Sequence, residues 1–402
     1  MPGPRDTSAS DDTSASDDTS ASDDTSASDD TSSDVTSNDE TRDGTAPGDR
    51  IDRQWMRVAL DAAAGARRLV SPRPWVGAVV VTPDGASFVG ATDGRTGPHA
   101  EVVAIARAGS RAAGATIYTT LEPCSHHGRT GPCADAVIAA GITRCVVGIT
   151  DPDPQVAGAG LARLERAGVE VEVGPLAPLV RRQLEPYLTH RGTGRPHVVL
   201  KLAATLDGRT AAPDGTSQWI TGPAAREDAH RLRADSDAIV VGAGTVRVDD
   251  PSLTVRLPDG EADGIEPLRV VLGAAAPDRK IHPCLEWDGP LPELLDALGE
   301  RGVLQVMVEG GAHVAAAFHG AGLVDRYVLY LAPALSGGDD ARALFAGPAA
   351  PTIADLWRGA IDDVRLLGPD LRIELRPLSG APSEIDPIAR GTEPAEITQG
   401  AH

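Results

Sequence analysis

The chain has 402 residues, which is too long for one compact domain and enough to build two hydrophobic cores. Its formal net charge is −21, and residues 1–50 carry 14 acidic side chains against three Arg, so much of the acidity belongs to this end. An acidic chain repels nucleic acid and anionic membranes, and no apolar run approaches the roughly 18 residues of a membrane span, so we expect neither partner.

Residues 1–50 form a low-complexity segment. The unit Asp-Thr-Ser-Ala-Ser-Asp repeats in tandem through about Asp30, with almost no apolar side chains. Such a segment cannot bury enough surface to offset the entropy of ordering, so we predict a disordered acidic tail. This end also lacks the charged-then-apolar pattern of a signal peptide, which predicts a cytoplasmic protein.

The segment 51–174 alternates helical and strand patterns. Trp55, Val58, Ala59 and Ala62 recur at helical spacing and predict an amphipathic helix. Apolar runs bounded by turn residues predict strands, and the segments between them have helical character. This alternation predicts an α/β sandwich. The predicted strands are 76–82, 87–91, 115–121 and 144–149, and the predicted helices are 99–108 and 131–140, before a helix–strand pair over 157–173.

The most informative motif is His99-Ala100-Glu101 followed by Pro123-Cys124 and Cys133. This is the zinc-deaminase signature, in which a His and two Cys thiolates hold Zn²⁺ and the Glu shuttles protons without binding the metal. Three protein ligands leave a fourth position for a water, whose pKa the metal lowers towards neutrality. The alternative is that His99 is an ordinary helix-start residue and the two cysteines are core thiols.

A polar, proline-bearing segment over 175–196 is predicted to be a linker, and a second α/β run follows it over 197–379. The last residues, 380–402, are predicted to be a flexible tail. Because strands again alternate with helices, the second run is predicted to be a separate α/β domain. Its predicted strands are 197–202, 237–242, 268–272, 303–308 and 326–331, and its predicted helices are 224–234, 291–301 and 312–321.

The string Glu122-Pro-Cys-Ser-His-His-Gly-Arg-Thr-Gly-Pro-Cys133 closely resembles the deaminase half of the bifunctional riboflavin-biosynthesis deaminase/reductase family. Five strings of the second run are similar to its reductase half, at 201–209, 217–221, 232–234, 245–256 and 308–311. The resemblance implies a cytidine-deaminase-like α/β sandwich followed by a dihydrofolate-reductase-like α/β domain. It implies zinc-dependent deamination of 2,5-diamino-6-ribosylamino-4(3H)-pyrimidinone 5′-phosphate, and then reduction of its ribosyl group to ribityl with NADPH.

The same resemblance implies site residues. His99, Cys124 and Cys133 bind Zn²⁺, and Glu101 is the catalytic proton shuttle. The implied NADPH contacts are Ala203, Trp219, Thr245, Asp249, Gly311, Ala312, His313, Val314, Ala315, Ala316 and Ala317. The implied substrate contacts are Ser217, Arg233, Leu253, Arg256, Glu309 and Lys201, with a surface position at a strand end as the alternative for Lys201. We also expect a homo-oligomer.

Three places depart from the family, and the smallest is Ala312, which replaces the Pro of a Gly-Gly-Pro string. Arg73 replaces the Asn of a Pro-Asn-Pro string, and this Arg either meets the phosphate or ribose of the substrate or blocks the pocket. The segment 277–289 lacks a clear strand, so we expect a strand of the reductase sheet to be lost. Two assignments stay open: Asp207 is either a reductase acid or a turn residue, and His126 and His127 either contact the substrate or ligate the metal.

The leading functional hypothesis is therefore a two-step enzyme. One alternative is that only one activity is retained, with the reductase degraded. A second alternative is a zinc-structured interaction protein whose acidic repeat recruits a partner. The presence of Glu101 argues against the second, because a structural zinc site has no use for a proton shuttle.

Overall fold

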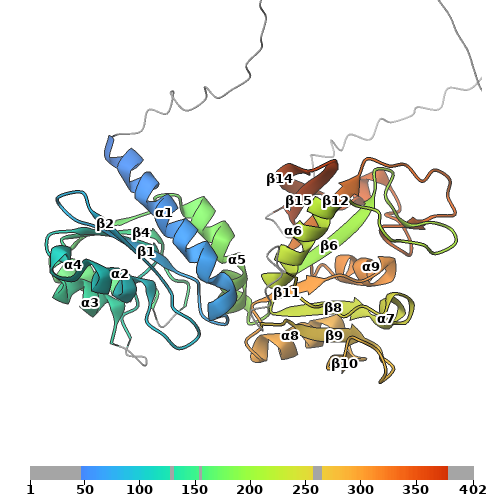
Figure 1. Cartoon of the computed structure of the whole chain (residues 1–402), viewed down its shortest axis with the longest axis horizontal. Coiled ribbons are helices and arrows are strands. Elements are labelled where there is room, and N and C mark those ends of the chain that lie inside the picture. The colour runs from blue at the N-terminus through green and yellow to red at the C-terminus, as the bar shows by residue number, and fades with distance from the viewer. Residues whose placement is uncertain (1–46, 127–130, 154–155, 257–264, 379–402) are drawn as a thin grey trace, which may run out of the picture. The chain divides into compact units, whose positions relative to one another are not determined.

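The computed structural model describes residues 47–126, 131–153, 156–256 and 265–378 (Figure 1). Most of the tail predicted over 1–50, the tail predicted over 380–402, and His127 lie outside these ranges. The first helix, α1 (Pro47–Val70), begins a few residues before the predicted domain boundary. Its buried side chains, Met56, Ala59, Ala63 and others, recur at helical spacing and form one apolar face.

The first sheet has the strand order β2-β1-β3-β4-β5. Strands β2 and β3 pair with β1 in antiparallel fashion, whereas β3, β4 and β5 are parallel. The strands predicted in this half are confirmed to within a residue or two. Their bounds are β1 Gly77–Val81, β2 Ser87–Ala91, β3 Thr116–Leu121, β4 Arg144–Ile149 and β5 Glu170–Val173.

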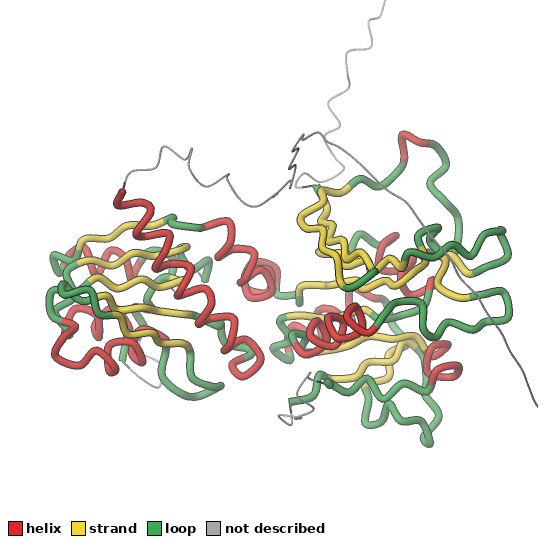
Figure 2. Tube along the Cα trace, turned by 45° about the horizontal axis from the view of Figure 1, so that its top comes forward, coloured by secondary structure: helices red, strands yellow, loops and turns green. Residues whose placement is uncertain are grey.

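Helices cover both faces of this sheet. Helices α1 and α5 pack on one face, and α2, α3 and α4 pack on the other (Figures 1 and 2). The parallel strands β3, β4 and β5 are followed by α3, α4 and α5. Because the strands run in one direction, the N-termini of these helices lie along the same edge of the sheet. The bounds are α2 Ala100–Ala108, followed by a 3₁₀ turn at Gly109–Ala112, then α3 Cys133–Ala139, α4 Ala159–Arg166 and α5 Ala177–Thr193.

Helix α5 corrects one prediction, because it occupies most of the segment 175–196 that we expected to be a linker. Val180, Leu184 and Tyr187 of α5 are buried in the same core as α1 and the first sheet. A proline in the first turn of this helix is tolerated, since the first N–H groups of a helix have no intrahelical partner. The first domain therefore continues through α5, and only a few residues join it to the next strand.

The second sheet has the strand order β10-β9-β8-β11-β6-β12-β15-β14. The strands from β10 to β12 are parallel to one another, and β15 and β14 complete the sheet as antiparallel neighbours. The bounds are β6 His197–Thr205, β8 Ala238–Gly242, β9 Leu268–Leu272, β10 Leu285–Trp287, β11 Gln305–Val308, β12 Arg326–Ala332, β14 Gly359–Leu367 and β15 Asp370–Pro377.

Successive residues of the parallel strands pack against different helices. In β6, Val198 and Leu200 share a core with α8 and α9, whereas Val199 packs with α6. Ile239 of β8 packs with α7 and its neighbour Val240 with α8 and α9. Continuous apolar strands are what a sheet covered on both faces requires. The helix bounds are α6 Pro223–Ala234, α7 Ala243–Asp249, α8 Leu291–Glu300 and α9 Ala312–Gly320.

The strand that we expected to be lost is present. Leu285–Trp287 form β10, which pairs in parallel with β9 at the edge of the sheet. Further features were not predicted, among them the antiparallel strands β14 and β15, a small sheet of β7 (Arg209–Ala211) with β13 (Arg342–Ala343), and a 3₁₀ turn at Ile353–Asp355. Among the described residues, no helix is both long and apolar enough to cross a membrane.

Candidate active sites

His99, Cys124 and Cys133 come together at two helix starts. His99 immediately precedes α2, Cys133 is the first residue of α3, and Cys124 follows β3 in a loop. Nδ1 of His99 lies 3.6 Å from Sγ of Cys124 and 3.2 Å from Sγ of Cys133. Zn–S and Zn–N bonds of about 2.3 and 2.0 Å place N and S about 3.5 Å apart around a tetrahedral ion. The three side chains therefore fit a single zinc ion.

The electrostatics of this trio also suit a cation. The hydrogen bond between the two thiols lowers the pKa of Cys124 to about 4 and raises the pKa of Cys133. The hydrogen bond to Cys124 raises the pKa of His99. The backbone N–H of Cys133 donates to Sγ of Cys124 at 3.4 Å, which stabilises a thiolate. The imidazole and the two thiols share protons because their donor atoms lie so close together. A divalent cation can bind to the same donor atoms by displacing those protons.

Glu101 lies beside the trio in the first turn of α2 and is buried. Its Oε2 has no hydrogen-bond partner among the described residues. Burial raises the pKa of this carboxyl, because a charged carboxylate is poorly solvated there. A carboxyl with a raised pKa and an oxygen free to meet a water is suited to taking up and releasing a proton.

Glu122, which the sequence motif left without a role, fixes the loop that carries Cys124. Its Oε1 accepts the backbone N–H groups of Gly160 at 2.9 Å and Leu161 at 3.4 Å, and its Oε2 accepts those of Gly158 at 2.9 Å and Asp151 at 3.2 Å. A Cβ on Gly160 would lie 1.9 Å from the carbonyl oxygen of the residue after Glu122, so only glycine fits there. The start of α4 is thus held against the zinc loop.

Arg73 supports the loop on the other side of the trio. One terminal nitrogen of its guanidinium, NH1, donates to the carbonyl oxygens of Gly94 and Gly97, each at 3.0 Å. These carbonyls belong to the loop that leads into His99. The structure therefore places Arg73 as a support of the metal-binding loop.

The second domain contains a cavity of about 790 Å³. It lies at the carboxyl ends of β6, β8 and β11, where ligands bind in open α/β sheets. Most of the residues implied by the family resemblance line it. From the predicted NADPH set these are Ala203, Thr245, Asp249, Gly311, Ala312, His313 and Val314, and from the predicted substrate set they are Lys201, Ser217 and Glu309.

The N-terminus of α9 opens into this cavity. Gly311 precedes the helix without a side-chain cap, and the helix's first backbone bond runs from Ala315 to the carbonyl oxygen of Gly311. The amides of Ala312, His313 and Val314 precede that bond and are available to an anion. A Cβ on Gly310 would lie 2.3 Å from Cβ of Val314, so the turn needs glycine. The cradle fits a phosphate-bearing cofactor.

A charged cluster borders the substrate side of the cavity. NH2 of Arg233 donates to Oε2 of Glu309 at 2.7 Å. Burial acts to raise the pKa of Glu309, but the charges of Arg233 and Lys201 outweigh it and lower that pKa. Burial and the nearby charges of Arg233 and Arg256 lower the pKa of His230. His230 carried no motif signal in the sequence, and it shares this cluster because α6 brings it one turn before Arg233.

Several predicted residues lie outside the cavity. Trp219 is 70% exposed beneath the guanidinium of Arg226 and lines a smaller adjoining cavity that also reaches Ser217. Leu253 is buried in an apolar core, and Arg256 is exposed. The last three residues of the predicted cofactor helix set, Ala315, Ala316 and Ala317, are also absent from the cavity lining. Conversely, Arg342 and Phe345 line it from a segment without any motif.

The contacts of Asp207 and the position of His126 bear on the two assignments that the sequence left open. Asp207 accepts the backbone N–H groups of Ser336 and Gly337, and the hydroxyl of Thr205 lowers its pKa to about 2. A carboxylate held in this way stays deprotonated at neutral pH, which favours the turn residue over the acid. His126 is exposed and does not belong to the group of metal-ligand atoms around His99.

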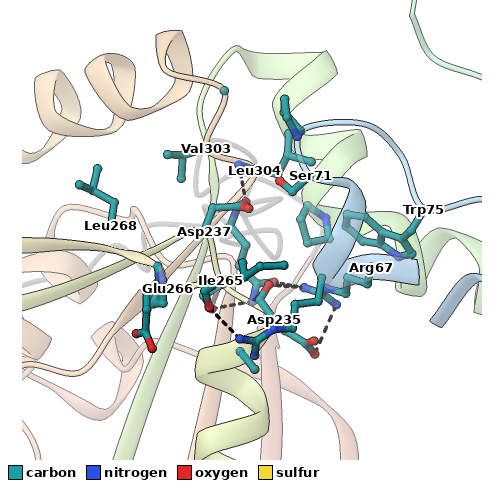
Figure 3. Close-up of a pocket in the computed structure, with 18 of the residues that line it drawn as sticks. Arg67, Ser71, Trp75, Asp235, Asp237, Ile265, Glu266, Leu268, Val303 and Leu304 are labelled. Atoms are coloured by element: carbon teal, nitrogen blue, oxygen red, sulfur yellow. Dashed lines mark hydrogen bonds and ion pairs between the residues drawn. The ribbon is translucent and has the colours of Figure 1, made fainter. Parts of the chain in front are cut away.

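A further cavity of about 250 Å³ lies beside the end of α1 (Figure 3). NH2 of Arg67 donates to Oε1 of Gln305 at 2.7 Å and to the carbonyl oxygen of Asp235 at 3.3 Å. The same guanidinium lies 4.8 Å from the ring centroid of Trp75. None of the residues assigned to zinc, NADPH or substrate is in its described lining. This cavity therefore belongs to the contact between α1 and the second domain.

Two family models match the chain. The cytidine and deoxycytidylate deaminase zinc-binding region matches residues 49–149, and the RibD C-terminal domain matches residues 196–367. Neither match covers the segment 150–195, which contains α4, β5 and α5.

Curated and solved relatives match both halves together. The riboflavin biosynthesis protein RibD of Mycobacterium tuberculosis is 42% identical over 80% of this chain and 96% of that protein. The protein of the same name from Escherichia coli is 39% identical over 81% of this chain and 99% of its own length. The solved structure of Acinetobacter baumannii RibD matches with a TM-score of 0.77 and 38% identity, over 82% of this chain and 99% of that one. The structure of a diaminohydroxyphosphoribosylaminopyrimidine deaminase/5-amino-6-(5-phosphoribosylamino)uracil reductase from Thermotoga maritima matches with a TM-score of 0.74 and 31% identity, over 82% and 100%.

Proposed function

This chain belongs to the RibD family of riboflavin biosynthesis enzymes, and from that premise we propose which of its residues perform each of the two reactions. The protein is a bifunctional enzyme of riboflavin biosynthesis, a zinc-dependent deaminase joined to an NADPH-dependent reductase. It acts on a small phosphorylated pyrimidine. We assign to it the diaminopyrimidinone ribosyl phosphate as first substrate, because the Thermotoga maritima relative bears the name of that deaminase.

For the deaminase, we assign zinc binding to His99, Cys124 and Cys133. A bound zinc ion lowers the pKa of a water so that hydroxide is available at neutral pH. Glu101 takes the proton of that water and delivers it to the amino group, which leaves as ammonia while the ring carbon gains the oxygen. The observation that carries this assignment is the convergence of three metal-ligand atoms beside a buried carboxyl with an unpartnered oxygen.

For the reductase, we assign the nicotinamide cofactor to the part of the cavity that the N-terminal amides of α9 face. Ala203, Thr245 and Asp249 line this cavity. When bound, NADPH supplies a hydride to the ribosyl group. Lys201 and Ser217 contact the substrate, and Glu309 presents its carboxylate to it. Arg233 acts through Glu309, since its NH2 is hydrogen-bonded to that carboxylate.

We assign the phosphate of the substrate to Arg256. Arg256 is exposed at the edge of the charged cluster, and its charge reaches His230. A flexible guanidinium at a rim is suited to capturing a phosphate in a bidentate way. Residues of the predicted sets that the cavity excludes, such as Leu253 and Ala315, support the walls from behind.

Product analysis tests both assignments together. Incubation of the purified protein with the diaminopyrimidine substrate alone should yield a product in which one amino group has become a carbonyl. Addition of NADPH should yield a second product that is heavier by two hydrogen atoms. A product that gains the two hydrogen atoms but keeps the amino group would leave only the reductase activity. Absence of the second product in the presence of NADPH would leave only the deaminase activity.

We also propose that the enzyme self-associates through the face formed by β14 and β15. Ile361, Val364 and Leu366 of the edge strand β14 are 64%, 53% and 73% exposed. Their partners across the strand pair are Leu375, Ile373 and Leu371, so all six share one apolar face. An exposed apolar face at a sheet edge is suited to a second copy of the chain. Light scattering on wild type and Leu366→Asp should show an oligomer that dissociates in the variant.

A cytoplasmic location remains part of the proposal. All four cysteines are free thiols, two of them the proposed metal ligands, and this suits a reducing compartment. Cell fractionation that recovers the protein from an oxidising compartment would contradict it.

A further inference from the structure

A second group of metal-ligand side chains lies far along the chain from the catalytic trio. His282, Cys284 and Glu286 lead into and lie in strand β10, and their ligand atoms all lie within 4.8 Å of one another. Alternate residues of an extended chain point to the same side, which explains why these three converge. None of them lines the reductase cavity. They lie in the segment 277–289, where the sequence departs from the family.

The spacing of the imidazole and the thiol fits a shared ion. Nδ1 of His282 lies 3.5 Å from Sγ of Cys284. A tetrahedral zinc ion with Zn–S of about 2.3 Å and Zn–N of about 2.0 Å separates these donors by about 3.5 Å. The corresponding separations in the catalytic trio are 3.6 and 3.2 Å. A similar N–S separation therefore occurs at two places among the described residues.

The backbone of one short segment orients two of the three ligands. Nε2 of His282 lies 3.0 Å from the carbonyl oxygen of Ala276. A carbonyl only accepts, so Nε2 carries the proton of the neutral ring and the lone pair of Nδ1 faces the thiol. The N–H of Ala275 donates to Oε1 of Glu286 at 2.9 Å, which leaves Oε2 for another partner. A ring N–H bonded to a backbone carbonyl is the outer support that metal-ligating histidines have.

The charges of the three side chains suit a divalent cation, and their exposure would let such an ion enter from solvent. A thiolate and a carboxylate together balance a divalent ion, and His282 completes the donor set as a neutral ligand. His282 and Cys284 are half-buried and Glu286 is exposed, so an ion can enter and a water can take the fourth position. The amine of the nearby Lys280 is engaged with Asp250 at 3.4 Å.

We propose that His282, Cys284 and Glu286 bind a divalent metal ion of the borderline-soft class, represented by Zn²⁺, at a site separate from the catalytic zinc. Mixed S, N and O donors select this class over Mg²⁺ or Ca²⁺, which prefer all-oxygen sites. The ion joins β10 to the preceding loop. The N–H of Lys280 in that loop donates to Oδ1 of Asp250 at the end of α7, next to Asp249 of the reductase cavity. The site therefore stabilises one wall of that cavity.

Metal counting on the full-length protein tests the proposal. The protein is stripped with chelator, reloaded with Zn²⁺ alone, desalted and analysed for zinc. We expect about two equivalents for wild type, about one for Cys284→Ala with deamination unchanged, and about one for Cys133→Ala with deamination lost. Cys145→Ala removes a buried thiol without ligating neighbours and is the matched control that keeps both equivalents.

A second readout does not depend on the folding of a variant. In wild type, bound Zn²⁺ should slow the alkylation of Cys284 by iodoacetamide at least about tenfold, as measured by peptide mapping. With Co²⁺ in place of Zn²⁺, Cys133→Ala should retain thiolate-to-metal charge-transfer absorption. A wild type that holds one equivalent, a Cys284→Ala protein that holds two, or alkylation of Cys284 that ignores zinc overturns the proposal and leaves a simple S–H···N hydrogen bond.

Discussion

Replacement of Glu122 by Gln should weaken the deaminase domain at the point where β3 is tied to α4. The carboxylate accepts four backbone N–H groups, two on each oxygen, and each oxygen makes one bond of 2.9 Å and one longer bond. Gln keeps one oxygen and presents an NH₂ group to the other two donors, whichever way the amide turns. Two bonds to a charged acceptor are lost, at about 1.5–3 kcal/mol each. Because one of each pair is long, we expect the free energy of unfolding to fall by about 2–4 kcal/mol.

The free energy of unfolding of the deaminase domain is measured by urea titration, with the release of zinc as the signal. Glu165→Gln on the exposed side of α4 is the matched control, and it should shift the free energy of unfolding by less than about 0.5 kcal/mol. Cys124 lies two residues after Glu122, so zinc affinity and deamination should fall with stability while NADPH oxidation persists. An unfolding midpoint for Glu122→Gln equal to that of the control would refute the role of this carboxylate.

Four other variants test the remaining assignments. Cys133→Ala should lose the zinc equivalent needed for deamination and keep the reductase, and elemental analysis showing no loss of zinc would contradict the ligand set. Glu101→Gln should keep its zinc but deaminate about 10²–10⁴-fold more slowly, and a decrease of less than about threefold would remove Glu101 from the mechanism. Arg256→Ala should raise the KM of the reductase substrate about tenfold in an NADPH-oxidation assay and leave deamination unchanged; an equal loss of both activities would argue against two independent sites. Burial lowers the pKa of His197 to about 3 from 6.5, so between these pH values the unfolded chain binds a proton that the folded chain does not. Stability should therefore fall as pH drops below about 6.5, by up to about 1.4 kcal/mol per pH unit. Urea unfolding at pH 7 and pH 5 should show a smaller loss for His197→Gln, and an equal loss would assign the effect to other groups.

The zinc motif and most regular elements could be predicted from the sequence because their signals are local. His99 and Glu101 are separated by a single residue, and the helix starts that carry His99 and Cys133 follow turn residues. Few reactions need three metal ligands and a carboxyl at these spacings, so the motif is sufficient to predict the deaminase half. The apolar strands of the second sheet were found for a similar reason: a strand covered on both faces is continuously apolar.

Helix α5 and the strands β14 and β15 escaped prediction because tertiary packing decided them. In α5, Val180 and Leu184 are separated by arginines and flanked by prolines, and only the core against the first sheet shows that they are buried. In β15, Arg372 and Glu374 are buried and ion-paired, whereas the apolar residues that alternate with them are only half-buried, so the alternation runs opposite to the usual one.

The sequence by itself determined the reaction class, since a metal-ligand set and a proton shuttle are carried by a few spaced residues. Tertiary structure alone decided which other side chains meet those residues. Arg233 on α6 meets Glu309 after β11, and the amides of Asp151 and Gly160 close on Glu122, although no local pattern links any of these pairs. The physical reason is that such contacts depend on which strands become neighbours in a sheet, and that order is set by long-range packing and not by the preferences of neighbouring residues.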